Sequence, residues 1–383
     1  MLELAVWFNL CCFVIHTTQL ICSPLYFMSR KWFYYYIRYT KEQFGILMTS
    51  ITQWFTPTLI RVSGDESVRG QLQQTKDGRL VTHFPNRIIL IANHQIYTEW
   101  LYLWWIAYTS KMHGAIYILL KESLKYIPML GPAMMFYGFV FMSRNWAKDK
   151  SRMGHRMRLL SERYPESQRL DPMWLLIFPE GTNLSANTRR KSKAWADKSG
   201  SKDFEHLVIP RSTGMLYCIQ QLRGTVDWIY DCTIAYEGIQ RDQYAQDFFT
   251  IRSTFLQGRP PKSVNMYWRR FKVADIPTED PKAFEAWIMG QWEQKEELIE
   301  YFYQSGRFPA DRAEANNLIP DGKPARSDSG KGYIETAVKL GSVWEISQIF
   351  LFLLSIGVLS FFLAKLYYLV AYGSIHGGRT EIG

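Results

Sequence analysis

A long uncharged segment near the C-terminus constrains this chain more than any other feature of its sequence. Residues 346–364 include no charged side chain, and the apolar run resumes after Lys365 through residues 366–370. A membrane-spanning α-helix needs about 20 consecutive apolar residues, and this segment meets that length. A buried core helix is the alternative. The pattern therefore predicts a transmembrane helix over residues 344–372, followed by a short tail over residues 373–383.

The N-terminal segment is also uncharged, over residues 4–28, although several polar residues dilute it. A cleaved signal peptide has basic residues before its apolar run and small residues at its cleavage site. Here Glu3 precedes the run, and Phe27 and Met28 end it. These features favour an uncleaved transmembrane anchor over residues 1–29.

A second membrane-associated segment follows this anchor. In residues 33–60, charged residues interrupt aromatic and aliphatic ones, which is typical of an amphipathic helix at a membrane interface. We therefore expect residues 30–57 to lie in the membrane surface or to dip into it as a re-entrant helix. If this helix does not cross, the body of the chain is cytosolic and the C-terminal tail lies across the membrane. Cytoplasmic flanks carry an excess of basic residues, which here are Arg30, Lys31, Arg38 and Lys41.

The composition of the 383-residue chain narrows the class of protein. With 47% hydrophobic and 21% charged residues, it is not a disordered chain, a collagen or a coiled coil. Its net charge of +10 favours an anionic partner, which could be nucleic acid, a phospholipid surface or a phosphorylated substrate. The basic residues 189–193 lack a DNA-binding pattern around them, so we expect a solvated loop near an anionic ligand and no nucleic acid. The five cysteines include no C-x-x-C pair and are expected to be reduced packing residues rather than zinc ligands.

In the body of the chain, short apolar runs alternate with helical stretches. This alternation predicts an α/β fold with a mixed, mostly buried sheet flanked by helices, over residues 58–308. Residues 309–343 are rich in proline, glycine and charge, which is typical of a linker. Strands are predicted at residues 59–62, 88–92, 115–119, 139–142, 175–178 and 229–235. Helices are predicted at residues 99–108, 146–164 and 212–222, and from an Asp280 cap and Pro281 to Tyr303.

His94 directly follows one of these predicted strands, and Glu99 comes five positions later. Residues five apart on an α-helix point about 140° apart, so the two side chains cannot share one helix face. If they meet, His94 lies in the turn after the strand and Glu99 reaches back from the first turn of the next helix. A carboxylate that fixes the tautomer of an imidazole leaves the other ring nitrogen able to remove a proton. A structural histidine is the alternative.

A second polar group follows the predicted strand at residues 175–178. Pro179 ends the strand, Glu180 supplies a carboxylate, Gly181 allows close backbone approach, and Thr182 offers a hydroxyl. Open α/β sheets bind ligands at the carboxyl ends of their strands. We therefore expect Glu180 at a ligand-binding edge; an ordinary strand-end turn is the alternative.

Asn93-His94 with an acidic residue at position 99, followed by Phe-Pro-Glu-Gly-Thr at residues 178–182, resembles the glycerolipid acyltransferase family. Residues 138–144 resemble the family block that ends in a phosphate-binding arginine, and residues 208–214 resemble the proline block beside the acyl site. The four blocks occur in the family's order. The pattern looks closer to the lysophosphatidylinositol and lysocardiolipin branch, and within it to fungal members, than to lysophosphatidic acid enzymes.

The resemblance implies transfer of a fatty acyl group from acyl-CoA, as co-substrate, to a hydroxyl of a lysophospholipid, with no cofactor and no metal. It implies that His94 is the general base and that Glu99 orients it. The family usually has aspartate at the second position, so the longer glutamate must approach the imidazole differently. The remaining implied residues bind substrates: Arg144 the acceptor phosphate; Glu180, Gly181 and Thr182 the acceptor; Pro210 and Arg211 the acyl or CoA path; and Lys121 an anion.

A negative Glu180 would repel a phosphate, so we expect it to contact a substrate hydroxyl or Arg144. Two other functions stay open. One is a lysophosphatidic acid acyltransferase that makes phosphatidic acid, and the other is a non-catalytic membrane scaffold with a degenerate acyltransferase domain. The apolar segments and the absence of a signal-peptide pattern favour an integral protein of the endoplasmic reticulum membrane, in contact with membrane lipid.

Overall fold

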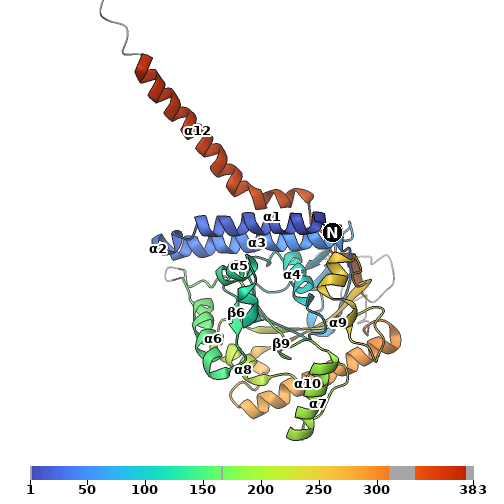
Figure 1. The fold of residues 1–383 in the computed structure, drawn as a ribbon. Coiled ribbons are helices and arrows are strands. Elements are labelled where there is room, and N and C mark those ends of the chain that lie inside the picture. The colour runs from blue at the N-terminus through green and yellow to red at the C-terminus, as the bar shows by residue number, and fades with distance from the viewer. Residues whose placement is uncertain (1, 165–166, 310–332, 377–383) are drawn as a thin grey trace, which may run out of the picture.

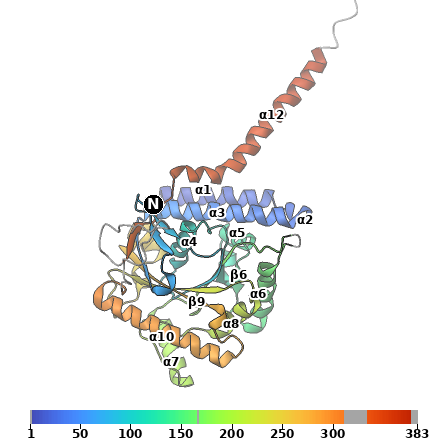
Figure 2. The ribbon, with the colours of Figure 1, turned by 180° about the vertical axis from the view of Figure 1, so that it is seen from behind.

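The computed structural model describes residues 2–164, 167–309 and 333–376. An eight-stranded sheet, in the order β10-β1-β9-β8-β4-β7-β5-β6, forms the centre of the molecule (Figures 1 and 2). The sheet strands are β1 Leu59–Gly64, β4 Arg87–Ala92, β5 Ile116–Lys121, β6 Val140–Met142, β7 Met173–Ile177, β8 Trp228–Tyr236, β9 Ser263–Lys272 and β10 Ile334–Ala337. A separate two-stranded sheet pairs β2 Leu72–Gln74 with β3 Leu80–Thr82.

Five neighbouring strands, β8, β4, β7, β5 and β6, run parallel, so their carboxyl ends meet at one edge of the sheet. β9 is antiparallel to β8, and β1 is parallel to β9. In the centre, Leu90 of β4 is in register with Leu176 of β7 and Tyr230 of β8. The predicted mixed α/β fold is confirmed, and each of the six predicted strands is present.

The helices of the body begin and end close to the predicted positions. α10 begins at Pro281 because the side chain of Asp280 accepts a hydrogen bond of 3.0 Å from the backbone nitrogen of Lys282. It is held to β8 by Lys295, whose buried ammonium lies 2.7 Å from the buried carboxylate of Asp231. The body helices are α4 Glu99–Thr109, α5 Leu130–Phe136, α6 Trp146–Ser161, α7 Ala186–Ser199, α8 Ser212–Gln221, α9 Ala245–Phe248 and α10 Pro281–Ser305.

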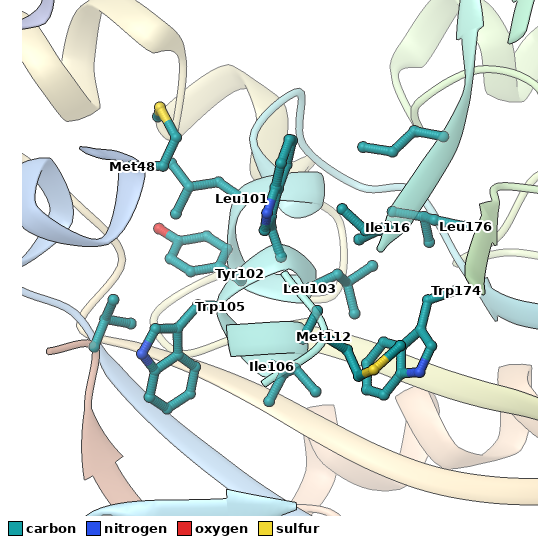
Figure 3. Close-up of a cluster of buried hydrophobic side chains, with 14 of the residues drawn as sticks. Met48, Leu101, Tyr102, Leu103, Trp105, Ile106, Met112, Ile116, Trp174 and Leu176 are labelled. Carbon is teal, nitrogen blue, oxygen red and sulfur yellow. The ribbon is translucent and has the colours of Figure 1, made fainter. Parts of the chain in front are cut away.

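Both faces of the sheet are buried because side chains alternate along each strand. On β4, Ile88 and Leu90 belong to the hydrophobic cluster that contains α4, whereas Ile89 and Ile91 belong to the cluster that contains α8 and α10. Figure 3 shows the first cluster, in which Leu103 of α4 is surrounded by side chains from neighbouring elements. This burial makes the sheet the rigid frame from whose edge the site residues extend.

The N-terminal segment forms two long helices, α1 (Leu2–Ile21) and α3 (Arg30–Phe55), joined through the short α2 (Leu25–Met28). Both views show α1 lying along α3, and α3 lying against the body of the protein (Figures 1 and 2). Gln19 of α1 donates a hydrogen bond of 3.1 Å to Thr40 of α3, and Lys41 of α3 donates one of 3.0 Å to the carbonyl of Ile116 on β5. The helix predicted as amphipathic is therefore packed between α1 and the sheet, and Lys41, one of the basic residues of the predicted cytosolic flank, is buried.

The C-terminal helix α12 (Gln348–His376) extends away from the body (Figures 1 and 2). Within the described residues, two segments are long and apolar enough to cross a membrane, Leu2–Met28 and Val343–Tyr368. Of the most apolar window in each, 39% is buried in the N-terminal segment and 6% in the C-terminal one. The predicted apolar helices at both ends are present, and α12 is the one with little protein around it.

Two predictions about the fold are wrong. Residues 189–193, predicted as a solvated loop, lie within α7, which begins at a capping box formed by Ser185 and Thr188. The predicted linker, residues 309–343, includes β10, which pairs antiparallel with β1 at the edge of the main sheet. The part of that linker at residues 310–332 lies outside the described residues.

Candidate active site

The predicted site residues come from loops at the carboxyl edge of the parallel strands. His94 follows β4, Glu180 follows β7, Arg144 follows β6, and Lys121 ends β5. Since these strands are parallel neighbours, the four segments lie on the same edge of the sheet. This is the edge at which open α/β sheets place ligands.

The loop that carries His94 is fixed to the sheet by its neighbour Asn93. The side-chain nitrogen of Asn93 donates to the carbonyl of Ile234 at 2.9 Å, and its side-chain oxygen accepts from the backbone nitrogen of the same residue at 2.8 Å. The backbone carbonyl of His94 accepts a hydrogen bond of 2.7 Å from Leu184, in the loop after β7. The position of the histidine is therefore set by both strands that flank β4, namely β8 and β7.

The predicted contact between His94 and Glu99 is confirmed. Nδ1 of His94 lies 2.7 Å from Oε2 of Glu99, which is the first residue of α4 and reaches back to the turn. Because an ionised carboxylate only accepts hydrogen bonds, Nδ1 is the donor in this contact, and Nε2 is the ring nitrogen that is left for another partner. Within the described chain, Nε2 has no hydrogen-bond partner, and the side chain of His94 is 18% exposed. The imidazole is thus held from one side and open on the other.

Glu99 is completely buried and accepts several hydrogen bonds besides that of the imidazole. Its Oε1 lies 2.8 Å from the backbone nitrogen of Gln95 and 3.2 Å from that of Ile96. The hydroxyl of Tyr236, on β8, donates to the same oxygen at 3.0 Å. Burial, and then the negative charge of Glu99, raise the pKa of Tyr236 well above its usual value, so this phenol stays a donor. These bonds hold the carboxylate in one orientation at the start of α4, where the helix dipole also favours a negative charge.

Phe178 and Glu180 support His94 from the loop after β7. The rings of His94 and Phe178 are stacked, with centroids 4.3 Å apart. The backbone nitrogen of His94 donates to Oε1 of Glu180 at 3.3 Å, whereas Oε2 of Glu180 has no partner within the described chain. Glu180 is 1% exposed, and burial followed by the charge of Glu99 raises its pKa well above the usual value. This carboxyl group therefore faces the loop that carries His94 rather than the solvent.

Of the two contacts predicted as alternatives for Glu180, a substrate hydroxyl or Arg144, the one with Arg144 is wrong, because Arg144 binds Gly181 instead. Nη2 of Arg144 donates to the backbone carbonyl of Gly181 at 2.9 Å. The side chain of Arg211 lies against the other side of this glycine, because a Cβ atom there would be 3.6 Å from Cδ and 3.7 Å from Nε of that arginine. Gly181 has a φ of +65°, a conformation that favours glycine, and its carbonyl is turned toward Arg144. The strand-end turn thus brings two exposed arginines together beside the histidine loop.

Arg144 itself has a φ of +65°, which is unusual for a residue with a side chain. The conformation turns the chain between β6 and α6, and the hydrogen bond to Gly181 accompanies it. Backbone strain of this kind concentrates at functional sites. Arg144 is therefore the more constrained of the two arginines.

The other predicted binding residues lie around this edge with fewer contacts. Thr182 is half-buried, and Pro210 is buried directly before the exposed Arg211. The backbone nitrogen of Arg211 donates to the carbonyl of Pro179 at 2.8 Å, which ties the proline block to the turn after β7. Lys121 is exposed, and its backbone is in register with Met142, two residues before Arg144.

Three residues of the site carry no role in the sequence interpretation. They are Asn93, Phe178 and Tyr236, which anchor the histidine loop, stack on the imidazole and bind Glu99. The first two stand inside the recognised blocks, so a local signal existed for them. Tyr236 does not, because it reaches Glu99 only through the pairing of β8 with β4.

Clusters of metal-ligating side chains and cysteine pairs are both absent from the residues that the structure describes. No group of three or more histidine, cysteine, aspartate or glutamate side chains in this part of the chain could hold a metal ion. The five cysteines are buried and unpaired with one another. Burial raises the pKa of Cys218 to about 12, so its thiol stays protonated and unreactive.

Comparisons with known proteins show the family of this chain. The family model for acyltransferases matches residues 60–237, and the model for the acyltransferase C-terminus matches residues 254–327. An uncharacterized acyltransferase of Schizosaccharomyces pombe is 38% identical over 77% of this chain and 82% of its own length. The 2-acyl-1-lysophosphatidylinositol acyltransferase of Saccharomyces cerevisiae is 37% identical over 74% of this chain and 78% of its own. Lysocardiolipin acyltransferase 1 of Gallus gallus is 29% identical over 74% of this chain and 68% of its own length.

Proposed function

The chain belongs to the acyltransferase family, and on this premise we propose that it transfers a fatty acyl group from acyl-CoA to a hydroxyl of a lysophospholipid of the lysophosphatidylinositol type. The relative from Saccharomyces cerevisiae, whose name states this acceptor, supports the choice of head group. Acyl-CoA is the co-substrate, and the reaction uses no further cofactor.

His94 is the general base of the proposed reaction. Its Nε2 takes the proton of the acceptor hydroxyl, and the hydroxyl oxygen attacks the thioester carbonyl of acyl-CoA. A new ester bond forms, the carbon–sulfur bond breaks, and the proton passes from the imidazolium to the departing thiolate of coenzyme A. The carboxylate of Glu99 faces the ring throughout, so it orients the imidazole and favours the positive charge that the ring gains.

One observation carries the proposal. The imidazole of His94 is bound through Nδ1 by a buried carboxylate, while Nε2 is unpaired and the ring is exposed at the ligand-binding edge of the sheet. A histidine with only a structural role at a strand end would have both ring nitrogens hydrogen-bonded to the protein or its ring buried by neighbouring side chains, since buried polar groups are almost always paired.

The substrates are placed by the arginines that meet at Gly181. We assign the acceptor phosphate to Arg144 and the acyl-CoA side to Pro210 and Arg211, because guanidinium groups form paired hydrogen bonds with phosphate oxygens. Gly181 and Thr182 line the acceptor between them, and Lys121 adds positive charge at the same edge. The buried Glu180 positions the His94 loop through its hydrogen bond to the backbone of His94.

We also propose that the protein is integral to the endoplasmic reticulum membrane, with the α/β body in the cytosol. The exposed Arg30 and Lys31, which follow the first apolar segment, support this orientation. A tag after α12 is then protected from protease in intact microsomes, whereas residues of the body are accessible. Cleavage of that tag in microsomes that have not been permeabilised would place the C-terminus and the α/β body on the same side of the membrane.

Purified full-length protein should be incubated with labelled oleoyl-CoA and, separately, lysophosphatidylinositol, lysocardiolipin, lysophosphatidic acid or glycerol 3-phosphate, beside a His94→Ala variant. We expect the highest kcat/KM with lysophosphatidylinositol. Activity confined to lysophosphatidic acid would replace this proposal with a phosphatidic acid-forming enzyme. No product above the level of the variant with any acceptor would leave a non-catalytic membrane scaffold.

A further inference from the structure

A second candidate site lies under the tip of the N-terminal helices, away from His94. A hollow of about 470 Å³ opens between α2, the start of α3, α5 and α6. Both views place these elements on the same side of the molecule (Figures 1 and 2). Its apolar wall consists of Tyr26, Phe27, Phe33, Tyr34, Met135 and Phe136, and Arg156 of α6 lines it from the body.

The hollow contains none of the residues of the candidate active site. α5 and α6 flank β6, and β7 and β5 separate β6 from β4, the strand that precedes His94. Neighbouring strands lie about 4.8 Å apart, so three steps across the sheet correspond to roughly 14 Å. A ligand in the hollow is therefore not held by the histidine loop.

Arg156 supplies a positive charge that no group in the described part of the chain pairs with. Across the described ranges, its side chain has no hydrogen bond or ion pair, although it is half-buried. The guanidinium lies close to Gly138, since a Cβ atom at that glycine would be 2.6 Å from Nη1 of Arg156. A half-buried arginine beside an aromatic wall, without an acceptor in the described chain, is suited to an anion.

The charges around the hollow are mainly positive. The guanidinium of Arg30 lies 5.2 Å from the ring of Tyr26, and Arg38 is close enough to repel the ammonium of Lys41 together with Arg156. The carboxylate of Glu42 is 3.6 Å from Arg38, with which it is paired. Burial raises the pKa of Tyr34, and the carboxylate of Glu162, directly after α6, is close enough to add to this rise. Within the described chain, no hydrogen bond joins Glu162 to Arg156.

The rim of the hollow is apolar and exposed. Phe27, at the end of the N-terminal candidate membrane segment, is 89% exposed, and Met135 of α5 is 57% exposed. Exposed apolar rims of this kind mark contact with a membrane or a partner. Because the adjacent segment is long and apolar enough to cross a membrane, we infer contact with the membrane rather than with a protein partner. The arginine favours a lipid with a negatively charged head group.

We propose that this hollow binds an anionic glycerophospholipid of the membrane, with its phosphate on Arg156 and the first carbons of its acyl chain against Phe27, Phe33 and Phe136. The bound lipid is not the molecule that is acylated. It joins the tip of the α1–α3 pair to the α/β body and holds both at the membrane surface.

Native mass spectrometry of the purified full-length protein in detergent tests this proposal independently of acyl transfer. The probe is 1-palmitoyl-2-oleoyl phosphatidic acid, compared with phosphatidylcholine of the same chains and with inorganic phosphate. We expect Arg156→Gln to lower retention of phosphatidic acid about tenfold, the effect of losing a hydrogen bond to a charged group. Arg158→Gln, an exposed arginine on the same helix, is the matched control and should retain the lipid like the wild type.

A second variant keeps Arg156 in place. Met135→Asp sets a carboxylate on the exposed rim of the hollow, where it competes for the guanidinium, and should lower retention of phosphatidic acid to a similar degree. Any of four results would overturn the proposal: unchanged retention by Arg156→Gln, unchanged retention by Met135→Asp, equal loss in Arg158→Gln, or equal retention of phosphatidylcholine. Displacement of the lipid by millimolar inorganic phosphate would assign the arginine to a free anion instead.

Discussion

Oε1 of Glu180 accepts a hydrogen bond from the backbone nitrogen of His94 at 3.3 Å, so the carboxyl group that ends β7 supports the loop that follows β4. Glu99 binds the imidazole of the same histidine. His94 therefore contacts two buried carboxyl groups of different character, one through its backbone and one through its ring. Glu99 is bound by several donors, whereas Oε2 of Glu180 has no hydrogen-bond partner in the described chain.

The first prediction concerns the pH dependence of stability caused by Glu180. Its folded-state pKa is raised well above the value of 4.5 expected in the unfolded chain, first by burial and then by Glu99. Between these two pKa values the folded state binds more protons than the unfolded state, so stability falls as pH rises above 4.5. Glu180→Gln keeps a neutral hydrogen-bond acceptor for the backbone of His94. It should remove the fall in the free energy of unfolding with pH, which amounts to at most about 1.4 kcal/mol per pH unit.

Thermal unfolding of both proteins in detergent, from pH 4.5 upward, measures the effect. The variant should gain stability relative to the wild type as pH increases. Glu285→Gln, a substitution of an exposed glutamate on α10, serves as the control. A constant difference between Glu180→Gln and the wild type across this range would mean that Glu180 is already ionised in the folded protein.

The second prediction concerns the general base. His94→Ala should lower kcat by about 10²–10⁴-fold, the usual contribution of a positioned acid–base group. The protein should remain in the membrane and stay folded, with an unfolding temperature lowered by the loss of the two contacts of the ring, the stacking on Phe178 and the hydrogen bond to the buried Glu99. A single-turnover assay measures the acyl-transfer step without product release. A near-normal rate of this step in His94→Ala would remove His94 from the mechanism.

The third prediction concerns the length of the acidic side chain. Glu99→Asp retracts the carboxylate by one methylene, so it can no longer reach His94, Gln95 and Tyr236 together. We expect a loss of about 10²-fold in kcat, as is typical of a misplacement near 1 Å. Glu99→Gln should lose more, because its amide group can donate to Nδ1 and so favour the wrong tautomer.

Tyr236→Phe is the matched control for this series. It removes one hydrogen bond to Glu99 and leaves the carboxylate and the imidazole in contact, so a loss of less than about tenfold is expected. Equal kcat values for wild type, Glu99→Asp and Glu99→Gln would show that orientation of His94 by this residue does not limit the reaction.

The fourth prediction separates the two arginines that meet at Gly181. Arg144→Ala should raise the KM for the lysophospholipid about tenfold or more, and that for acyl-CoA much less, since a charge-assisted bond to the phosphate is lost. Arg211→Ala should have the opposite pattern. Steady-state kinetics with each substrate varied in turn provides the measurement, and an equal rise of both constants in both variants would indicate structural arginines.

Much of the fold could be predicted from the sequence because its signals are local. Apolar runs bounded by turn residues gave the central strands, and Asp280 followed by Pro281 gave the start of α10. The local geometry of a contact between His94 and Glu99 could also be predicted. Residues five apart cannot share one helix face, so His94 has to lie in the turn and Glu99 in the first turn of the helix, as the structure shows. Chain-local geometry was sufficient for these features.

β9 and β10 could not be read in this way. β9 is not among the predicted strands, and its Arg269 is a charged side chain that is buried beside Asp231, its partner on the neighbouring strand β8. β10 is four residues long and becomes a strand only by pairing with β1, far away in the chain. In both cases the stabilising partner is distant in sequence.

The sequence by itself determined the α/β class, the apolar helices at both ends and the one local geometry in which His94 and Glu99 could meet, because turn chemistry and hydrophobic periodicity act over a few residues. Only the tertiary structure decided that Glu180 faces His94 rather than Arg144, that Arg144 and Arg211 meet at Gly181, and that Arg156 lines a hollow beneath the N-terminal helices. These arrangements depend on which strands are neighbours and on which charged groups lose contact with water. Both are consequences of packing between segments that are far apart in the chain.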